Sequence, residues 1–234
     1  MNEEMKRSEA IDIKSLKRKA ITRVSLVYLI LGLAFFLSAW TIKYWQGWAY
    51  IVTIAIPMVI FGAYMFKHDP KLLERRLRTK EKRKEQKLIQ IVGILPFLLT
   101  FVLPGFDVRF GWSAVPVLVS IIGLALVLFG YLLTLYVFKI NSFAARVVDV
   151  EKEQKVITTG PYALVRHPMY FALIFFYGAT PLALGSYWAL IPASLIFPIL
   201  IFRIKDEEKE LLENLEGYRE YTQKVKSRFI PGVW

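Results

Sequence analysis

The sequence contains no cysteine and only two histidines, His68 and His167. A chain without cysteine cannot form disulfides, thiolate nucleophiles or cysteine-ligated zinc sites. Two histidines also argue against a histidine-rich metal centre. Internal repeats and low-complexity tracts are missing as well, so 234 residues suggest a single domain. Any chemistry must therefore use oxygen and nitrogen groups, or a bound cofactor.

Long apolar runs dominate what is present. Hydrophobic residues make up 56% of the chain, which is too apolar for a soluble protein of this size. About twenty charged and polar residues precede the first run and no small-residue cleavage site follows it, so we expect a true span rather than a signal peptide. The pattern predicts an all-α integral membrane protein with about six hydrophobic segments. These are Thr22–Ile42, Trp48–Phe66, Leu88–Leu103, Trp112–Phe138, Met169–Leu184 and Ser186–Phe202.

The net charge of +12 has a simple distribution. If each run crosses once from a cytoplasmic N-terminus, only Lys43 and Arg109 of the 31 Lys and Arg residues lie outside. This is the positive-inside asymmetry, so both termini are expected to be cytoplasmic. The basic surplus suits anionic lipid headgroups, and without an aromatic-basic surface motif it gives little support to nucleic-acid binding. The inside segments are 1–23, 67–87, 139–168 and 203–234.

Three regions follow from this organisation. Residues 1–21 form a cytoplasmic segment, either an interfacial helix or a polar tail. Residues 22–138 hold four transmembrane segments and a charged cytoplasmic connector, 67–87, in which leucines at helical spacing predict a surface helix. His68 lies beside Asp69 in this connector, which gives little reason to assign it a function. Residues 139–234 carry the polar motifs and are expected to form the catalytic region.

The fifth run is short. Its sixteen residues span roughly 24 Å as a helix, against a hydrocarbon core of about 30 Å. Gly178, Pro181 and Gly185 are expected to end it before the sixth run begins. Met169–Phe202 is therefore predicted to be a tight helical hairpin, which returns the residues at its two ends to the same cytoplasmic face.

Ionisable side chains lie at both ends of this hairpin. Arg166 and His167 precede it, and Arg203 and Glu207 follow it at positions i and i+4, on one helical face. Polar groups at the ends of membrane helices are costly and suggest a site. An ion pair between Arg203 and Glu207 is the ordinary structural alternative, as is a simple helix start at Pro168.

The start of the hairpin suits a zwitterionic or partly cationic ligand. Backbone amides at the helix start after Pro168, together with His167, could bind a carboxylate. The rings of Tyr162 and Tyr170 could face a cation. Glu207 could accept hydrogen bonds from two ribose hydroxyls.

Two stretches of sequence resemble a known family. Lys155–Tyr170 (KVITTGPYALVRHPMY) is similar to the cofactor-binding signature of the isoprenylcysteine carboxyl methyltransferases and of their relatives among phospholipid methyltransferases. Arg203–Tyr221, with an EExxL motif, Gly217 and two tyrosines, resembles the C-terminal part of that pattern, as does Pro231. The resemblance covers roughly residues 139–234. Within the family, the chain resembles the bacterial and archaeal members most.

The resemblance implies S-adenosylmethionine bound at the cytoplasmic face, under a lid formed by the C-terminal tail. It implies that Arg203 faces the acceptor carboxylate. The gap EGYREY is shorter than in eukaryotic members, so the lid is expected to be organised differently. The residues implied to bind the cofactor are Lys155, Val156, Ile157, Tyr162, His167, Pro168, Met169, Tyr170 and Glu207.

We therefore expect a multi-pass methyltransferase of the bacterial or archaeal cell (inner) membrane. Its acceptor would be a lipophilic or prenylated molecule entering from the bilayer, most simply a carboxylate, which needs no general base; an amine would need one. Two alternatives stay open. One is an NADPH-dependent reductase of the sterol-reductase type, with phosphate-binding basic groups from residues 67–87. The other is a non-catalytic membrane protein on the same fold.

Overall fold

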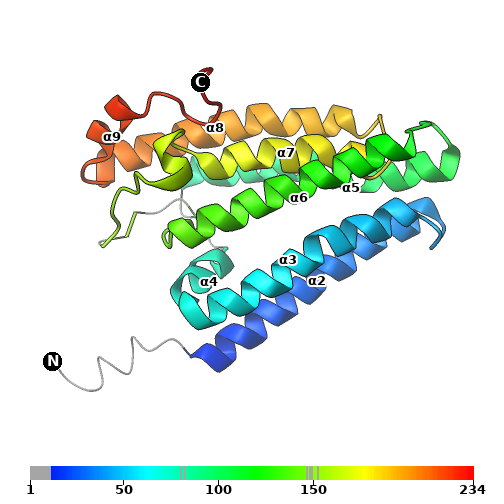
Figure 1. Cartoon of the computed structure of the whole chain (residues 1–234), viewed down its shortest axis with the longest axis horizontal. Helices are drawn as coiled ribbons and strands as arrows, with labels where there is room; N and C mark the ends of the chain where they lie inside the picture. Colours follow the sequence, from blue (N-terminus) through cyan, green and yellow to red (C-terminus); the bar gives the residue numbers. More distant parts are fainter. Residues whose placement is uncertain (1–11, 80, 82, 146, 148–149, 152) are drawn as a thin grey trace.

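The computed structural model describes residues 12–79, 81, 83–145, 147, 150–151 and 153–234, and within them all regular structure is helical. Figure 1 shows the helices packed as a bundle. In chain order the elements are α2 (Ile13–Ala39), α3 (Trp45–His68), α4 (Pro70–Leu77), α5 (Lys84–Phe110), α6 (Val117–Ile140), the 3₁₀ turn η1 (Gly160–Ala163), α7 (Pro168–Ala183), α8 (Leu190–Asn214) and α9 (Tyr218–Lys224).

Four helices, α2, α3, α5 and α6, are each long and apolar enough to cross a membrane. Helix α7 is apolar but has only 16 residues. Helix α8 is apolar as far as Phe202 and then continues as a charged helix to Asn214. Large apolar side chains such as Leu29 and Leu33 of α2 are exposed on the outside of the bundle, where lipid would cover them. The prediction of an all-α, multi-pass integral membrane protein is confirmed.

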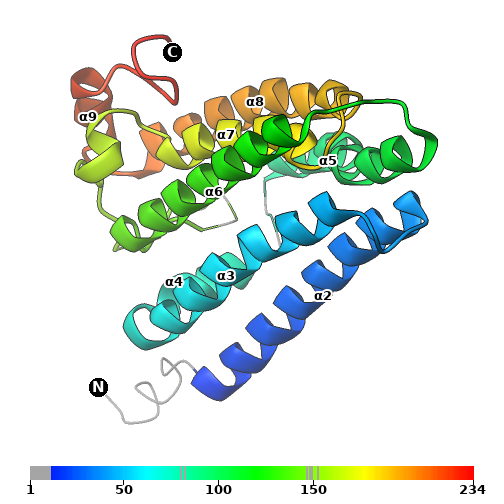
Figure 2. The same ribbon diagram turned by 45° about the vertical axis from the view of Figure 1, so that its right-hand side comes forward.

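Successive long helices run antiparallel, so their ends gather in two groups (Figures 1 and 2). One end holds the short turns 40–44, 111–116 and 184–189, and we call it the turn end. The other holds the start of α2, helix α4, the start of α7, the charged half of α8 and the C-terminus, and we call it the charged end. The described parts of the basic segments identified in the sequence thus meet at one end of the bundle, as the six-run topology requires.

Close packing of α6 on α7 fixes the position of the hairpin. A Cβ atom on Gly123 would lie 2.5 Å from the backbone nitrogen of Ala183, and one on Gly130 would lie 2.6 Å from the carbonyl oxygen of Ala172. Only glycine therefore fits at these two positions, which are seven residues apart on one face of α6. Small residues on facing helices allow this close approach in membrane bundles.

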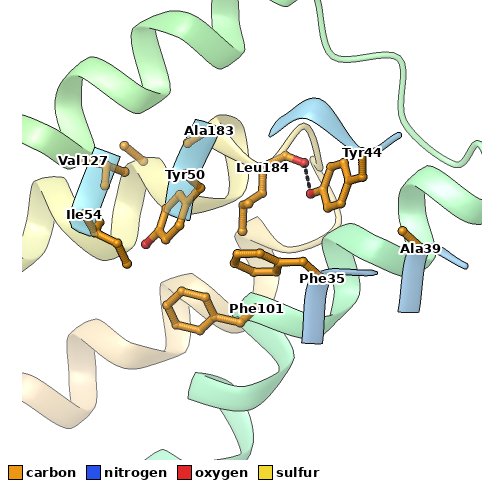
Figure 3. Close-up of a cluster of buried hydrophobic side chains, with 10 residues drawn as sticks. Phe35, Ala39, Tyr44, Tyr50, Ile54, Phe101, Val127, Ala183 and Leu184 are labelled. Atoms are coloured by element: carbon orange, nitrogen blue, oxygen red, sulfur yellow. Dashed lines mark hydrogen bonds between the residues drawn. The ribbon is translucent and has the colours of Figure 1, made fainter. Parts of the chain in front are cut away.

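Aromatic side chains form much of the core where α2 and α3 pack against α5, α6 and α7. Phe35 of α2, Tyr50 of α3 and Phe101 of α5 are buried together, with Phe35 and Tyr50 in edge contact at a centroid distance of 5.8 Å (Figure 3). The hydroxyl of Tyr44 donates a hydrogen bond to the carbonyl oxygen of Leu184, which joins the α2–α3 turn to the end of α7. The core therefore holds the hairpin against the N-terminal helices near the turn end.

The expected breaks in the fifth run differ from the structure. Helix α7 continues through Gly178 and Pro181 and ends at Ala183, so these two residues do not end it. Buried packing against neighbouring helices supports a proline near the end of a membrane helix. The break comes at Gly185, whose φ of +75° suits glycine, and it leaves the predicted hairpin intact.

The helix predicted in the charged connector 67–87 is present as α4, and its Leu72 is buried. Asp69 caps α4 by accepting a hydrogen bond from the Leu72 amide at 3.0 Å. Arg75 of α4 forms a salt bridge with Glu151 at 2.6 Å and donates to the carbonyl oxygen of Ser142 at 2.8 Å. The connector is therefore fastened to the loop that follows α6.

Candidate functional site

A pocket lies at the charged end where α7 begins and α8 turns polar. Its cavity volume is about 100 Å³, and the pocket opens to solvent. The hairpin brings the two polar segments together in its walls, although they are far apart in sequence. All ten residues proposed from the sequence line it: Lys155, Val156, Ile157, Tyr162, His167, Pro168, Met169, Tyr170, Arg203 and Glu207.

Tyr170 connects the two segments through its hydroxyl. This group donates to Glu207 Oε2 at 2.6 Å and accepts from Arg203 Nε at 2.9 Å. Arg203 and Glu207 lie one helical turn apart on α8, and the buried Tyr170 hydroxyl, from α7, bridges them. The three side chains form a fixed polar wall in which Glu207 has a second oxygen, Oε1, left to accept further hydrogen bonds.

His167 lies between two neighbouring carboxylates and is buried. Its Nδ1 is 4.0 Å from Glu207 Oε1, and its Nε2 is 3.4 Å from Glu208 Oε1, without the geometry of a hydrogen bond. The His167 amide donates to the carbonyl oxygen of Arg228 at 2.7 Å, which places the C-terminal segment behind it. The imidazole thus lies beside two carboxylates of α8, while the C-terminal segment binds the His167 backbone.

The helix start offers fewer backbone donors than expected. Pro168 has no N–H, and the amides of Tyr170 and Phe171 both donate to the carbonyl oxygen of His167, at 3.0 and 3.2 Å. An anion at this point would rely mainly on the Met169 amide and on the His167 side chain.

Tyr162 closes another wall of the pocket from η1. Its hydroxyl accepts from Asn141 Nδ2 at 2.7 Å, and its carbonyl oxygen accepts from the Tyr221 hydroxyl at 2.7 Å. Burial raises the pKa of Tyr162 to about 12, so the phenol is neutral at physiological pH. Gly160, with φ of +60°, allows η1 to lie against Ile140 at the end of α6.

The remaining lining residues come from an extended loop and from the apolar helix start. Val156 packs on the cluster of Leu215, Tyr218 and Tyr221, so the Lys155–Ile157 stretch lies over the short helix α9. Met169 packs beside Tyr170 in the cluster that includes Ile204 of α8. Apolar packing thus positions both stretches.

Helix α5 supports the polar half of α8 from the outside. Arg83, just before α5, binds Asp206 at 2.6 Å and also pairs with Glu210, while Gln86 donates to Asp206 at 2.5 Å. These contacts fix the rotation of α8 that turns Arg203 and Glu207 toward the pocket. Basic residues of the connector are therefore used to hold the frame of the site.

Several polar residues that line the pocket were not assigned to it from the sequence, among them Asn141 and Tyr218. Asn141 follows the end of α6 and gives no local signal of its role. Tyr218 follows Gly217, whose φ of +78° starts α9, and its buried hydroxyl has no partner among the described residues. Buried hydroxyls are normally hydrogen-bonded, so this atom is a candidate to contact a ligand. The tyrosines after Gly217 were part of the family resemblance and could have pointed to it.

Comparison with known families gives one match. Residues 118–219 match the sequence model of the phospholipid methyltransferase family. No curated protein matches the chain. The matched region begins in α6, earlier than the resemblance suggested, and includes the hairpin and the start of α9, the elements that build the pocket. Over these residues the chain is similar to the phospholipid methyltransferases, and the match indicates a methyltransferase of the membrane.

Proposed function

We propose that the protein is an S-adenosylmethionine-dependent methyltransferase that acts on a lipid or lipidated acceptor. The observation that carries this proposal is the polar wall of Arg203, Tyr170 and Glu207. It lies where α8 changes from apolar to charged, within the region similar to phospholipid methyltransferases. A water-soluble donor and a lipid acceptor can meet at such a boundary.

The residues in the pocket fit S-adenosylmethionine. Glu207 Oε1 is a carboxylate oxygen suited to ribose hydroxyls, and the rings of Tyr162 and Tyr170 suit a sulfonium cation. Tyr218 adds a buried hydroxyl without a protein partner among the described residues. The cofactor, when bound, supplies an activated methyl group, and the chain's own contribution is to bind, orient and exclude water.

Arg203 is our candidate for binding the acceptor. It follows Phe202, which is 62% exposed, at the point where α8 changes from apolar to charged, and we infer that a lipid headgroup would approach its guanidinium there. A guanidinium can hold a carboxylate through two parallel hydrogen bonds, a geometry that lysine cannot match. A carboxylate is already ionised at neutral pH and needs no general base, so alignment by Arg203 would suffice.

A phospholipid amine is the second candidate acceptor, and the description of the matched family favours it. An amine must lose a proton before or during transfer. The Glu207 carboxylate lines the pocket, accepts from the Tyr170 hydroxyl at 2.6 Å and could accept that proton. The two candidates therefore assign different roles to Arg203 and Glu207.

An NADPH-dependent reductase has less support. Its extra phosphate would need several basic groups converging on the pocket. Arg75 and Arg83 of the connector are instead bound to Glu151 and Asp206. Among the described residues that line the pocket, Arg166 is paired with Glu208 and Arg203 is bound to Tyr170, which leaves Lys155 and His167 as the other basic groups there.

We further propose that the charged end faces the cytoplasm of a bacterial or archaeal cell, since cytoplasmic ends carry the excess of Lys and Arg. Reporter fusions after Lys43, Arg109 and Gly185, in the turns, should report the outside. A fusion after Gln154 should report the inside. An inside signal at Arg109 would overturn the six-run topology.

A transfer assay with labelled S-adenosylmethionine tests the function and separates the acceptors. The purified protein is supplied with an isoprenylated cysteine or with phosphatidylethanolamine. Arg203→Lys should lower transfer to the carboxylate by about tenfold or more, because a bidentate contact is lost, while cofactor affinity stays close to normal. Arg219→Lys, on an exposed arginine at the same end, is the control. If the methyl group is transferred to neither acceptor, the proposed class of acceptor is wrong. If Arg203→Lys instead loses cofactor affinity, Arg203 supports the cofactor and does not bind the acceptor.

A further inference from the structure

Two adjacent glutamates of α8 face different parts of the molecule. Glu207 lines the pocket, whereas Glu208 is turned about 100° around the helix and is not among the described residues that line the pocket. The Glu208 side chain is 7% exposed. A buried carboxylate must be paired to remain in place, so its partners indicate its role.

Glu208 joins the segment before α7 to the C-terminal segment. Its Oε1 accepts from Arg166 Nε at 2.7 Å, and its Oε2 accepts from Arg228 Nε at 2.7 Å. Charge-assisted hydrogen bonds of this length are among the strong ones. One carboxylate thus cross-links two parts of the chain that are about sixty residues apart.

The backbone reinforces this cross-link. We name residues 225–229 the strap. The amides of Arg166 and His167 donate to the carbonyl oxygens of Ser227 and Arg228, at 3.0 and 2.7 Å. Arg166 Nη1 also donates to the carbonyl oxygens of Val225 and Lys226. The strap therefore runs directly behind the two residues that precede α7.

The strap ends in a buried side chain next to the polar wall of the pocket. Phe229 packs in the cluster that contains Tyr170 and Ile204. His167, between the strap and the pocket, has its Nε2 3.4 Å from Glu208 Oε1. Displacement of the strap would consequently remove support from both His167 and Tyr170.

We propose that Glu208 is a positioning residue, which locks the strap against the start of α7 and so holds His167 and Tyr170 in their ligand-binding positions. This inference rests on the proposed function, because the ligand concerned is the methyl donor. Glu207 contacts the ligand directly, whereas Glu208 acts through the strap. The paired glutamates thus have separate roles.

The test measures the strap and the ligand separately. Trypsin cleaves after Lys226 and Arg228, so the rate of cleavage in the strap reports its release without any ligand. Calorimetry and a chase experiment give the affinity and dissociation rate of S-adenosylhomocysteine. Glu208→Gln should raise strap cleavage and weaken S-adenosylhomocysteine binding by about tenfold each, mainly through faster dissociation, because one charged hydrogen bond is lost. Glu213→Gln, exposed on the same helix, removes the same charge and should change neither.

A second pair of variants guards against misfolding at the buried carboxylate. Arg228 is 35% exposed, so Arg228→Ala should keep the fold while it releases the strap. Arg228→Lys restores the charge and should recover most of the affinity. Because Arg228→Ala removes one cleavage site, strap release in this pair is measured at Lys226.

The outcomes are distinct. Faster strap cleavage with unchanged S-adenosylhomocysteine affinity makes the strap purely structural and overturns the proposal, as does unchanged cleavage in Glu208→Gln and Arg228→Ala. If the wild-type protein does not bind S-adenosylhomocysteine, the proposed function fails and the positioning role fails with it, while the cleavage rates still report whether Glu208 locks the strap.

Discussion

The two ends of the helix bundle use buried polar groups in different ways. At the turn end, the buried Asp107 accepts hydrogen bonds from the amide and hydroxyl of Ser113, both at 2.6 Å, and from the hydroxyl of Ser186. These contacts tie the α5–α6 turn to the α7–α8 turn, and both carboxylate oxygens accept hydrogen bonds. At the charged end, Glu207 and Tyr218 keep hydrogen-bonding atoms that the described chain does not satisfy.

This difference shows how one bundle combines a rigid frame with a receptive site. Glu208 resembles Asp107, because both are buried carboxylates that hold separate segments together. Glu207, one residue earlier than Glu208, faces a cavity. Burial of a carboxylate therefore does not identify a site by itself; hydrogen-bonding capacity left over at a pocket wall does.

The largest expected effect concerns the turn end. Asp107→Ala leaves the buried Ser186 hydroxyl and two partly buried Ser113 donors without their acceptor. It should lower the free energy of unfolding by about 2–4 kcal/mol, since an unsatisfied buried donor costs about 1–3 kcal/mol and a partly buried one, which water can reach, costs less. Thermal unfolding in detergent measures it. Asp107→Asn keeps one acceptor oxygen and should lose less. The comparison breaks if Asp107→Ala is as stable as the wild type.

At the charged end the same kind of change should affect binding and not folding. Glu207→Gln and His167→Ala each remove one charge-assisted or strong hydrogen bond, worth about 1.5–3 kcal/mol, or roughly ten- to a hundredfold in S-adenosylhomocysteine affinity. Calorimetry measures the affinity, and the unfolding temperature is the control. Unchanged affinity in both variants would mean that the ligand binds elsewhere.

Tyr218→Phe sharpens the comparison because it removes only the hydroxyl without a partner. If a ligand uses this hydroxyl, affinity for S-adenosylhomocysteine should fall by about 0.5–1.5 kcal/mol, or roughly two- to twelvefold. Stability without ligand should stay equal or rise slightly, because an unsatisfied buried hydroxyl is lost. Tyr221→Phe is the contrasting variant, since the Tyr221 hydroxyl donates to the carbonyl oxygen of Tyr162 and its loss should reduce stability. Equal affinity in Tyr218→Phe and wild type would remove Tyr218 from the site.

The smallest effect near neutral pH concerns the strap. Burial tends to raise the pKa of Glu208, but His167, Arg228 and Arg166 outweigh it and lower that pKa to about 2, from an ordinary value of 4.5. A lowered pKa in the folded state means that the stabilisation is complete above pH 4.5 and is lost as the pH falls toward 2. Pepsin cleavage of the strap, divided by pepsin cleavage of an unfolded peptide at the same pH, should therefore be constant down to pH 4.5 and then accelerate. Glu208→Gln should lack this step, and an identical step in that variant would assign it to another group.

The sequence was sufficient to predict that the two polar segments meet. A hairpin of two helices must return its ends to the same face, so Arg203 and His167 could be placed together from spacing alone. The periodicity of α8 likewise placed Arg203 and Glu207 on one face. The ten proposed residues all line one pocket, and their roles stay predictions.

Other features depend on contacts that spacing does not encode. The different roles of Glu207 and Glu208 depend on where the strap runs. The sequence after α9 has no periodic pattern from which that path could be predicted. The role of Asp107 could not be predicted from spacing, because its partners Ser113 and Ser186 come from two different turns. The continuation of α7 through Pro181 depends on burial between helices, which overrides the usual helix-breaking effect of proline.

Titration calorimetry of the full chain in detergent micelles, with S-adenosylhomocysteine and with NADPH, tests the central claim most directly. The account predicts saturable binding of S-adenosylhomocysteine at one site per chain, weakened by Glu207→Gln, and no saturable binding of NADPH. Saturable binding of NADPH, or a folded wild-type protein that does not bind S-adenosylhomocysteine, would contradict it.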